Sequence, residues 1–281
     1  MAALLALLLT SGCSSFEIFY GLADVYIENQ AADYLDLGDA DEDHLERQVD
    51  ALMAWHKAEM LPRYASYLRE QATNIEGHRM DRSTVSDGID DFKLLMDDTI
   101  RGIAKHAAPV LLRHTSESRR RYLATRMEVN DPDRRPPGAP PLTETEDREA
   151  YIRERSNRII ENFETLTGPL SGTQEDIIRH YVFEGSFIRK RWRAYRQMRR
   201  RAFLAKLAEA PAPAEFETFI FETLLRSEKL VGPQYTAEAQ EWWQGIVTVI
   251  HAVLGSLDEH QRKELIGNLR GYAGDMIRAA S

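Results

Sequence analysis

The chain has 281 residues, a formal net charge of −9 at pH 7 and a single cysteine. One cysteine excludes an internal disulfide, so stability has to come from a hydrophobic core, which a chain of this length can bury in one domain or two. The acidic balance, 45 Asp and Glu against 36 Lys and Arg, argues against nucleic acid as a partner.

The first predicted segment is a short secretory leader. Ala2 to Leu9 is an unbroken apolar run of eight residues, far short of the roughly 20 that a membrane-spanning helix needs. Ser11 and Gly12 place small residues directly before Cys13, as at the cleavage site of a bacterial lipoprotein signal. We expect cleavage before Cys13 and fatty acylation of that residue, because two or more acyl chains hold a protein stably on a membrane.

This leader departs from the usual pattern in two ways. Thr10 stands where lipoprotein signals usually carry leucine, and no Lys or Arg precedes Cys13, although a signal normally begins with positive charge. We therefore expect the true start to lie upstream. The alternative interpretation is an apolar N-terminus with an incidental buried cysteine.

Helical periodicity covers nearly all of the chain after the leader. Apolar residues recur at steps of three and four in residues 45–60, 85–107, 152–163, 177–195, 242–253 and 265–276. No sustained period-two segment and no Asn-Gly or Asp-Gly hairpin signal is present. We predict an all-α fold, a multi-helix bundle of antiparallel helix hairpins with about nine helices.

Polar side chains mark several of the predicted helix starts. Three sites place a capping residue three positions before Glu or Gln, the spacing that satisfies two backbone N–H groups at once: Thr143 with Glu146, Ser171 with Gln174, and Asp258 with Gln261. Thr115 and Thr236 are predicted as simpler caps. Pro62 and Pro109 fall inside helical patterns, where proline is expected to distort the helix.

A proline-rich segment near the middle of the chain is the one predicted linker. Residues 130–141 hold five prolines and a glycine, which cannot continue a helix. We therefore divide the chain into a leader (1–12), an N-terminal helical half (13–129), a linker (130–142) and a C-terminal helical half (143–281). The alternative is a single domain built from both halves.

Signals for catalysis are weak. His56 and Glu59 lie at i, i+3 on one predicted helix, a spacing at which imidazole and carboxylate can share a metal, but no second copy of the motif exists. The competing interpretation is a surface pair beside a core tryptophan. Because no nucleophile elbow and no glycine-rich phosphate loop is present, we expect a non-enzymatic protein without catalytic residues, metal or cofactor.

A strongly basic stretch is the sharpest anomaly in charge. The candidate residues for binding an anionic surface are Arg189, Lys190, Arg191, Arg193, Arg196, Arg199, Arg200 and Arg201. The alternative is internal pairing, because residues 24–59 carry eleven acids against Arg47 and Lys57. Both interpretations remain open at the level of sequence.

The whole chain resembles an uncharacterised group of proteobacterial lipoproteins, the domain-of-unknown-function 6279 family. The most specific likeness is Leu52-x-x-Trp55-His56-x-x-Glu59-x-Leu61-Pro62-x-Tyr64. The family-motif residues, whose role is unknown, are Trp55, His56, Glu59, Pro62 and Tyr64. The resemblance implies a helical protein anchored in the cell envelope, and it supplies no activity, cofactor or catalytic residue. In the lipoproteins that it resembles, Ser14 after the cysteine favours the outer membrane.

A local likeness suggests a class of function. The helix starts at Leu170 and Leu257, of the form Leu-Ser/Asp-x-x-Gln, look like the Leu-Thr-x-x-Gln motif of periplasmic stress chaperones. Our leading expectation is a lipoprotein held on the outer membrane through Cys13 and facing the periplasm. It would bind another envelope protein or anionic lipid as chaperone, adaptor or scaffold. The alternative is a metal- or carboxylate-dependent hydrolase of an envelope polymer.

Overall fold

The computed structural model describes residues 16, 20–131, 134, 138, 143–225 and 228–281. Across these ranges the regular elements are all helices and no strand occurs, so the predicted all-α fold is confirmed. None of the described helices combines the length and the apolar character needed to cross a membrane.

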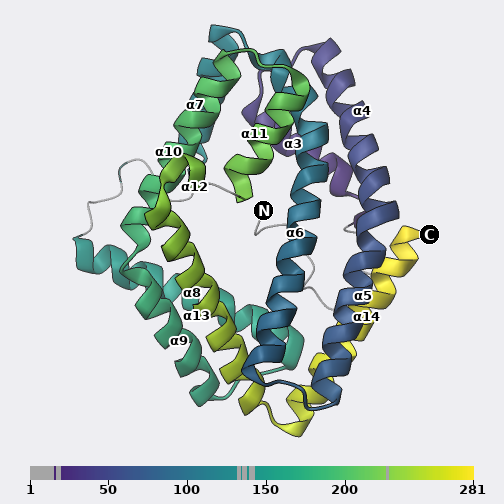
Figure 1. The fold of residues 1–281 in the computed structure, drawn as a ribbon, viewed down its shortest axis with the longest axis vertical. Coiled ribbons are helices and arrows are strands. Elements are labelled where there is room, and N and C mark those ends of the chain that lie inside the picture. Colours follow the sequence, from purple (N-terminus) through teal and green to yellow (C-terminus); the bar gives the residue numbers. More distant parts are fainter. Residues whose placement is uncertain (1–15, 17–19, 132–133, 135–137, 139–142, 226–227) are drawn as a thin grey trace.

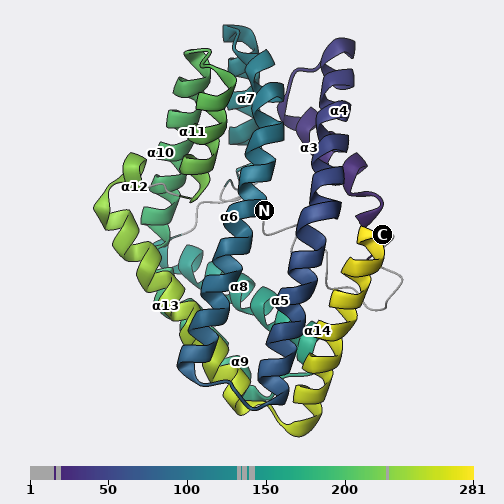
Figure 2. The same cartoon turned by 45° about the vertical axis from the view of Figure 1, so that its right-hand side comes forward.

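Two long helical segments run nearly the full height of the molecule (Figures 1 and 2). The first is α4 (Asp39–Trp55), which continues through a π-helical segment, η2 (His56–Met60), into α5 (Leu61–Glu76). The second is α6 (Arg82–Leu111), which packs on α4 and α5 and ends in the 3-10 turn η3 (Leu112–His114).

The shorter helices gather in two groups along the long segments. The group at the top in Figure 1 comprises α3 (Ala23–Tyr34), α7 (Glu117–Val129), α10 (Arg189–Ala208) and α11 (Pro213–Leu225). The group at the bottom comprises α8 (Glu144–Thr167), α9 (Gly172–Ser186), α13 (Pro233–Ser256) and α14 (Glu259–Ala280). The short α12 (Glu228–Val231) connects α11 to α13. Helices α3, α11, α13 and α14 pack directly on the two long segments.

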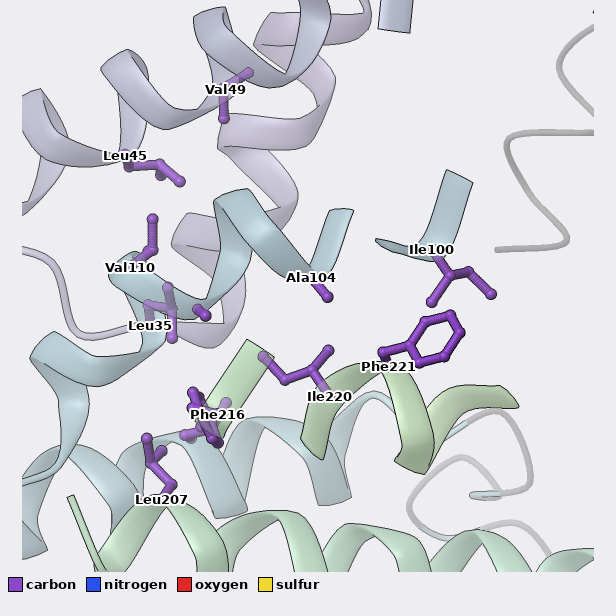
Figure 3. Close-up of a cluster of buried hydrophobic side chains, with 12 residues drawn as sticks. Leu35, Leu45, Val49, Ile100, Ala104, Val110, Leu207, Phe216, Ile220 and Phe221 are labelled. Carbon is purple, nitrogen blue, oxygen red and sulfur yellow. The ribbon is translucent and has the colours of Figure 1, made fainter. Parts of the chain in front are cut away.

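Each group encloses a hydrophobic core with residues from both sides of the proline-rich segment. In the upper core (Figure 3), Val49 and Val110 of the long segments meet Leu207 and Phe216 of α10 and α11. The lower core contains Ala72, Ile75, Ile160, Leu170, Ile178, Val249, Val253, Leu257, Leu265 and Leu269. The two halves of the chain therefore share their cores.

The helix ends test the capping predictions directly. All three predicted capping boxes form with reciprocal hydrogen bonds. The two simpler caps are wrong. Ser116, not Thr115, caps α7, and α13 begins at Pro233, three residues before Thr236, because proline is well suited to the first helical position.

The predicted linker lies between α7, which ends at Val129, and α8, which begins at Glu144. Its described residues form no helix. One of them, Asp131, accepts a hydrogen bond from Arg200 of α10 at 3.1 Å. This contact fixes one end of the segment against the upper group of helices.

Candidate functional site

The family-motif residues lie where α4 passes into α5. Trp55, His56, Pro62 and Tyr64 are half-buried, whereas Glu59 is exposed. The π-helical segment begins at His56, so the most specific part of the motif coincides with the one interruption of this long helix. Such π segments are frequent at functional sites in proteins.

Pro62 explains why the helix changes its hydrogen bonding here. Proline has no N–H to donate to the carbonyl of Ala58, and its ring crowds that carbonyl. The helix accommodates it with a wider turn, in which the Leu61 N–H donates to the carbonyl of His56, five residues back. The predicted distortion at Pro62 therefore takes the form of a π segment.

An aromatic cluster surrounds His56. The Tyr20 hydroxyl lies 3.0 Å from Nδ1 of His56, and the two rings stack with centroids 5.8 Å apart. The ring of Tyr64 packs on the other side at 5.6 Å. Burial lowers the pKa of His56 to about 4 and raises the pKa of Tyr20 to about 12. At neutral pH both groups are therefore uncharged.

The same motif also joins the two long helical segments. Trp55 packs against Gly102 of α6 so closely that a Cβ atom at Gly102 would overlap the indole ring. The Tyr64 hydroxyl is hydrogen-bonded to Thr99 of α6. The motif residues Trp55 and Tyr64 thus hold α6 against the α4–α5 helix.

The structure does not bring His56 and Glu59 together as a metal site. Glu59 points to solvent, while His56 turns to Tyr20. Among the described residues, no group of three or more His, Cys, Asp or Glu side chains is placed to hold a metal ion.

A half-open cavity of about 310 Å³ lies in the lower part of the molecule. Its walls come from α5, the N-terminal part of α6, α8, α13 and α14, and the last three belong to the lower group of helices in Figure 1. Apolar side chains form most of the lining: Leu68, Ile75, Met80, Val85, Ile89, Phe163, Leu166, Ile250, Leu254, Leu265 and Leu269. The volume falls at the lower end of the range typical of ligand pockets.

Sequence analysis missed this cavity. Its lining is drawn from five helices on both sides of the proline-rich segment and from the α5–α6 turn, and most of its apolar residues belong to ordinary helical stripes. A weak signal existed in Gly88, a glycine in the apolar face of α6, which lets Gln71 of α5 approach closely. A single sequence cannot show that five such stripes leave space between them.

Two of the predicted helix starts are joined by a buried pair of side-chain hydrogen bonds, called here the Gln174–Gln261 joint. The side-chain amides of Gln174 and Gln261 donate to each other's oxygen, both at 3.0 Å. Each amide also donates to a loop carbonyl of the other hairpin: Gln174 to Ser256 and Gln261 to Pro169. The chaperone-like motif residues therefore lock the α8–α9 hairpin to the α13–α14 hairpin.

The basic stretch forms α10, and many of its cations have acidic partners. Arg189 and Arg193 lie near Asp147 of α8, at 2.6 and 3.9 Å, and Arg191 lies 2.7 Å from Glu238 of α13. Further ion pairs join Lys190 to Glu144 and Arg200 to Asp131. The guanidinium of Arg199 lies over the ring of Tyr235. Arg196 is half-buried and Arg201 is exposed.

Two acids of residues 24–59, Asp33 and Asp41, pair with basic residues outside α10. Asp41 accepts from Arg113 and Arg119, which lower its pKa to about 2, and Asp33 pairs with Arg126 of α7. The ion pairs described for α10 run instead to α8, α13 and Asp131. Internal pairing is therefore extensive for α10, whereas the ion pairs described for residues 24–59 involve Asp33 and Asp41. The pairs of one stretch do not join it to the other.

The predicted lipidation site, Cys13, lies outside the described residues. In comparisons with known proteins, the family model described as a family of unknown function (DUF6279) matches residues 33–236, more than half of the chain. This range contains the family-motif residues and all of α10. Neither the curated proteins nor the solved structures contain a match.

Proposed function

The chain belongs to the DUF6279 family of unknown function, and from that premise we propose that it is a lipid-anchored protein of the bacterial envelope that binds an apolar partner and is not an enzyme. The apolar cavity carries this proposal. The anchor is supported by the leader and the small residues before Cys13. The protein would face the periplasm from the outer membrane and act as a chaperone, adaptor or scaffold.

The lining of the cavity favours binding over hydrolysis. A hydrolase of an envelope polymer would need convergent carboxylates with perturbed pKa values in a pocket. No carboxylate is among the described residues that line the cavity. The acids whose pKa values are most strongly lowered, Asp41 and Asp81, are held in an ion-pair cluster and in the N-terminal cap of α6, respectively.

In-cell photo-crosslinking tests the binding role. A photoreactive amino acid at Asn162, an exposed residue that lines the cavity, should form adducts with a partner in living cells. The same amino acid at Glu117, an exposed residue of α7 in the upper group, serves as the matched control. Equal capture at both positions, or none at Asn162, would contradict the proposal.

The anchor is tested separately. Cells that express the protein or its Cys13→Ala variant are labelled with a fatty-acid analogue, and labelling should be lost in the variant. Equal labelling of both forms would remove the lipid anchor from the proposal while leaving the binding role of the cavity intact.

A further inference from the structure

One arginine, Arg79, is among the described residues that line the apolar cavity, and it and two further arginines, Arg82 and Arg262, are bound to neutral acceptors. Arg79 lines the cavity and donates from Nε and Nη2 to the amide oxygen of Asn74, at 3.2 and 2.8 Å. Nearby, Arg82 donates to Thr248 and Gln244 of α13. In α14, Arg262 lies 3.1 Å from Nδ1 of His78 and also donates to a backbone carbonyl.

This pattern differs from that of the basic helix α10, where carboxylates accept from many of the arginines. Two acids close in sequence to these arginines already have partners. Asp81 caps α6 through Ser83 and Thr84, and Glu259 pairs with Lys263 at 2.7 Å. An anionic ligand could therefore bind these arginines without breaking an ion pair.

The guanidinium of Arg79 is suited to an anionic head group. Nε and Nη2 are used by a single amide oxygen, so further N–H donors remain for a second acceptor. A carboxylate matches the planar fork of a guanidinium and forms short, charge-assisted hydrogen bonds with it. The other polar residues of the lining, such as Gln71 and Asn162, are uncharged.

The apolar part of the cavity sets the rest of the ligand. Eleven aliphatic, aromatic and thioether side chains surround a space of about 310 Å³ that is open on one side. A space at the small end of the usual range favours one hydrocarbon chain over the two chains of a phospholipid. Burial of each methylene group there should strengthen binding about fourfold.

We propose that the cavity binds a fatty acid, with the hydrocarbon chain among the apolar residues of α5, α6, α8, α13 and α14 and the carboxylate held by Arg79. This inference rests on the proposed binding function and names the chemical class of its ligand. It makes the α5–α6 turn, which carries Arg79, the part of the protein that recognises the head group.

Calorimetric titration with laurate and with uncharged dodecanol tests the assignment. The protein used is the full chain with Cys13→Ala, so that no acyl group of its own is present. Arg79→Gln should weaken laurate binding about tenfold, as expected for the loss of a charge-assisted hydrogen bond, and leave dodecanol binding unchanged. Arg121→Gln removes the same charge from an exposed ion pair on α7 and should change neither affinity.

Filling the cavity tests the position of the chain. Leu254→Trp should weaken the binding of both ligands, because its ring would occupy the space. If that variant does not fold, Asn162→Trp covers the opening from an exposed position of α8 and should have the same effect. Unchanged laurate binding in the folded variant would place the ligand elsewhere and overturn the proposal.

Three further outcomes would overturn the fatty-acid assignment: equal affinities for laurate and dodecanol, laurate binding that is insensitive to Arg79→Gln, or tighter binding of dodecyl phosphate than of laurate. If laurate does not bind while photo-crosslinks at Asn162 persist, the ligand class is wrong and the proposed binding function stands. Loss of both results would contradict the proposed function itself.

Discussion

At the scale of single residues, Gly102 and Trp55 show how tightly the long helical segments approach each other. The indole ring occupies the space where any larger residue at position 102 would place its Cβ. Because Gly102 lies within the regular helix α6, its backbone conformation does not require glycine. The contact with Trp55 is what requires it.

Gly102→Ala should therefore lower the free energy of unfolding by about 1–3 kcal/mol, the usual cost of overpacking a well-packed site. Gly267→Ala is the matched control, because a Cβ atom there meets nothing within 4 Å. That exposed change in α14 should stabilise the protein by about 0.5–1 kcal/mol through helix propensity. Urea denaturation measures both, and equal effects of the two variants would refute the packing argument.

His56 gives the stability of the protein a pH dependence of known sign. Its pKa is about 4 in the folded protein against 6.5 ordinarily, so the unfolded chain binds more protons between these values. Stability should fall as the pH drops from 6.5 towards 4, with a slope of at most about 1.4 kcal/mol per pH unit from this group.

Replacing the imidazole isolates this contribution. His56→Phe should show a shallower loss of stability in the same pH range, measured by urea denaturation at several pH values. Burial also lowers the pKa values of His106 and His114, but both residues are present in either protein and their effects cancel in the comparison. His260→Phe, which removes an exposed ring of α14, is the control, and identical slopes for the unchanged protein and His56→Phe would contradict the assignment.

At the scale of helices, the ends were predictable where one local interaction decides them. The capping box at Ser171 needs only residues three positions apart, and it formed as expected. Thr236 failed because Pro233 started the same helix earlier. The π segment was not predicted, since Pro62 shows that the helix is disturbed without showing whether it kinks, ends or widens.

The Gln174–Gln261 joint can be tested with a double-mutant cycle. Each single change to Ala leaves one buried amide without its partner and breaks a capping box, which should cost about 1–3 kcal/mol. The double variant should lose less than the sum, because neither amide then remains unpaired. Gln240→Ala, at an exposed position of α13, should change stability by no more than about 0.5 kcal/mol. Strict additivity in the cycle would show that the joint contributes no coupling.

At the scale of the whole molecule, sequence patterns gave the helical class but not the assembly. The apolar stripes that contain Ile160 and Val249 predicted two buried helix faces, and the structure shows that they meet in one core. Which stripes face each other depends on contacts between residues far apart in the chain, and one sequence holds no record of them. The cavity and its rim escaped prediction for the same reason.

The shared cores predict how the chain responds to cleavage. A specific protease site placed between Asp131 and Thr143 should allow cutting without separation of the two fragments, since both cores draw residues from each side. Size-exclusion chromatography after cleavage should show a single species with helical content retained. Elution as two separate fragments would show that the halves are independent domains.

The π segment at the family motif also fixes how α5 is rotated about the helix axis relative to α4. A π turn holds one more residue than a regular α turn, and each residue turns an α-helix by about 100°. The extra residue therefore sets which face of α5 is presented to α14 relative to the face that α4 presents to α6. Deleting one residue between His56 and Met60 would turn the rest of this helix by about 100° and direct the side chains of Leu68 and Ile75 away from the lower core, so the phase of this single helix decides whether the cavity has a wall.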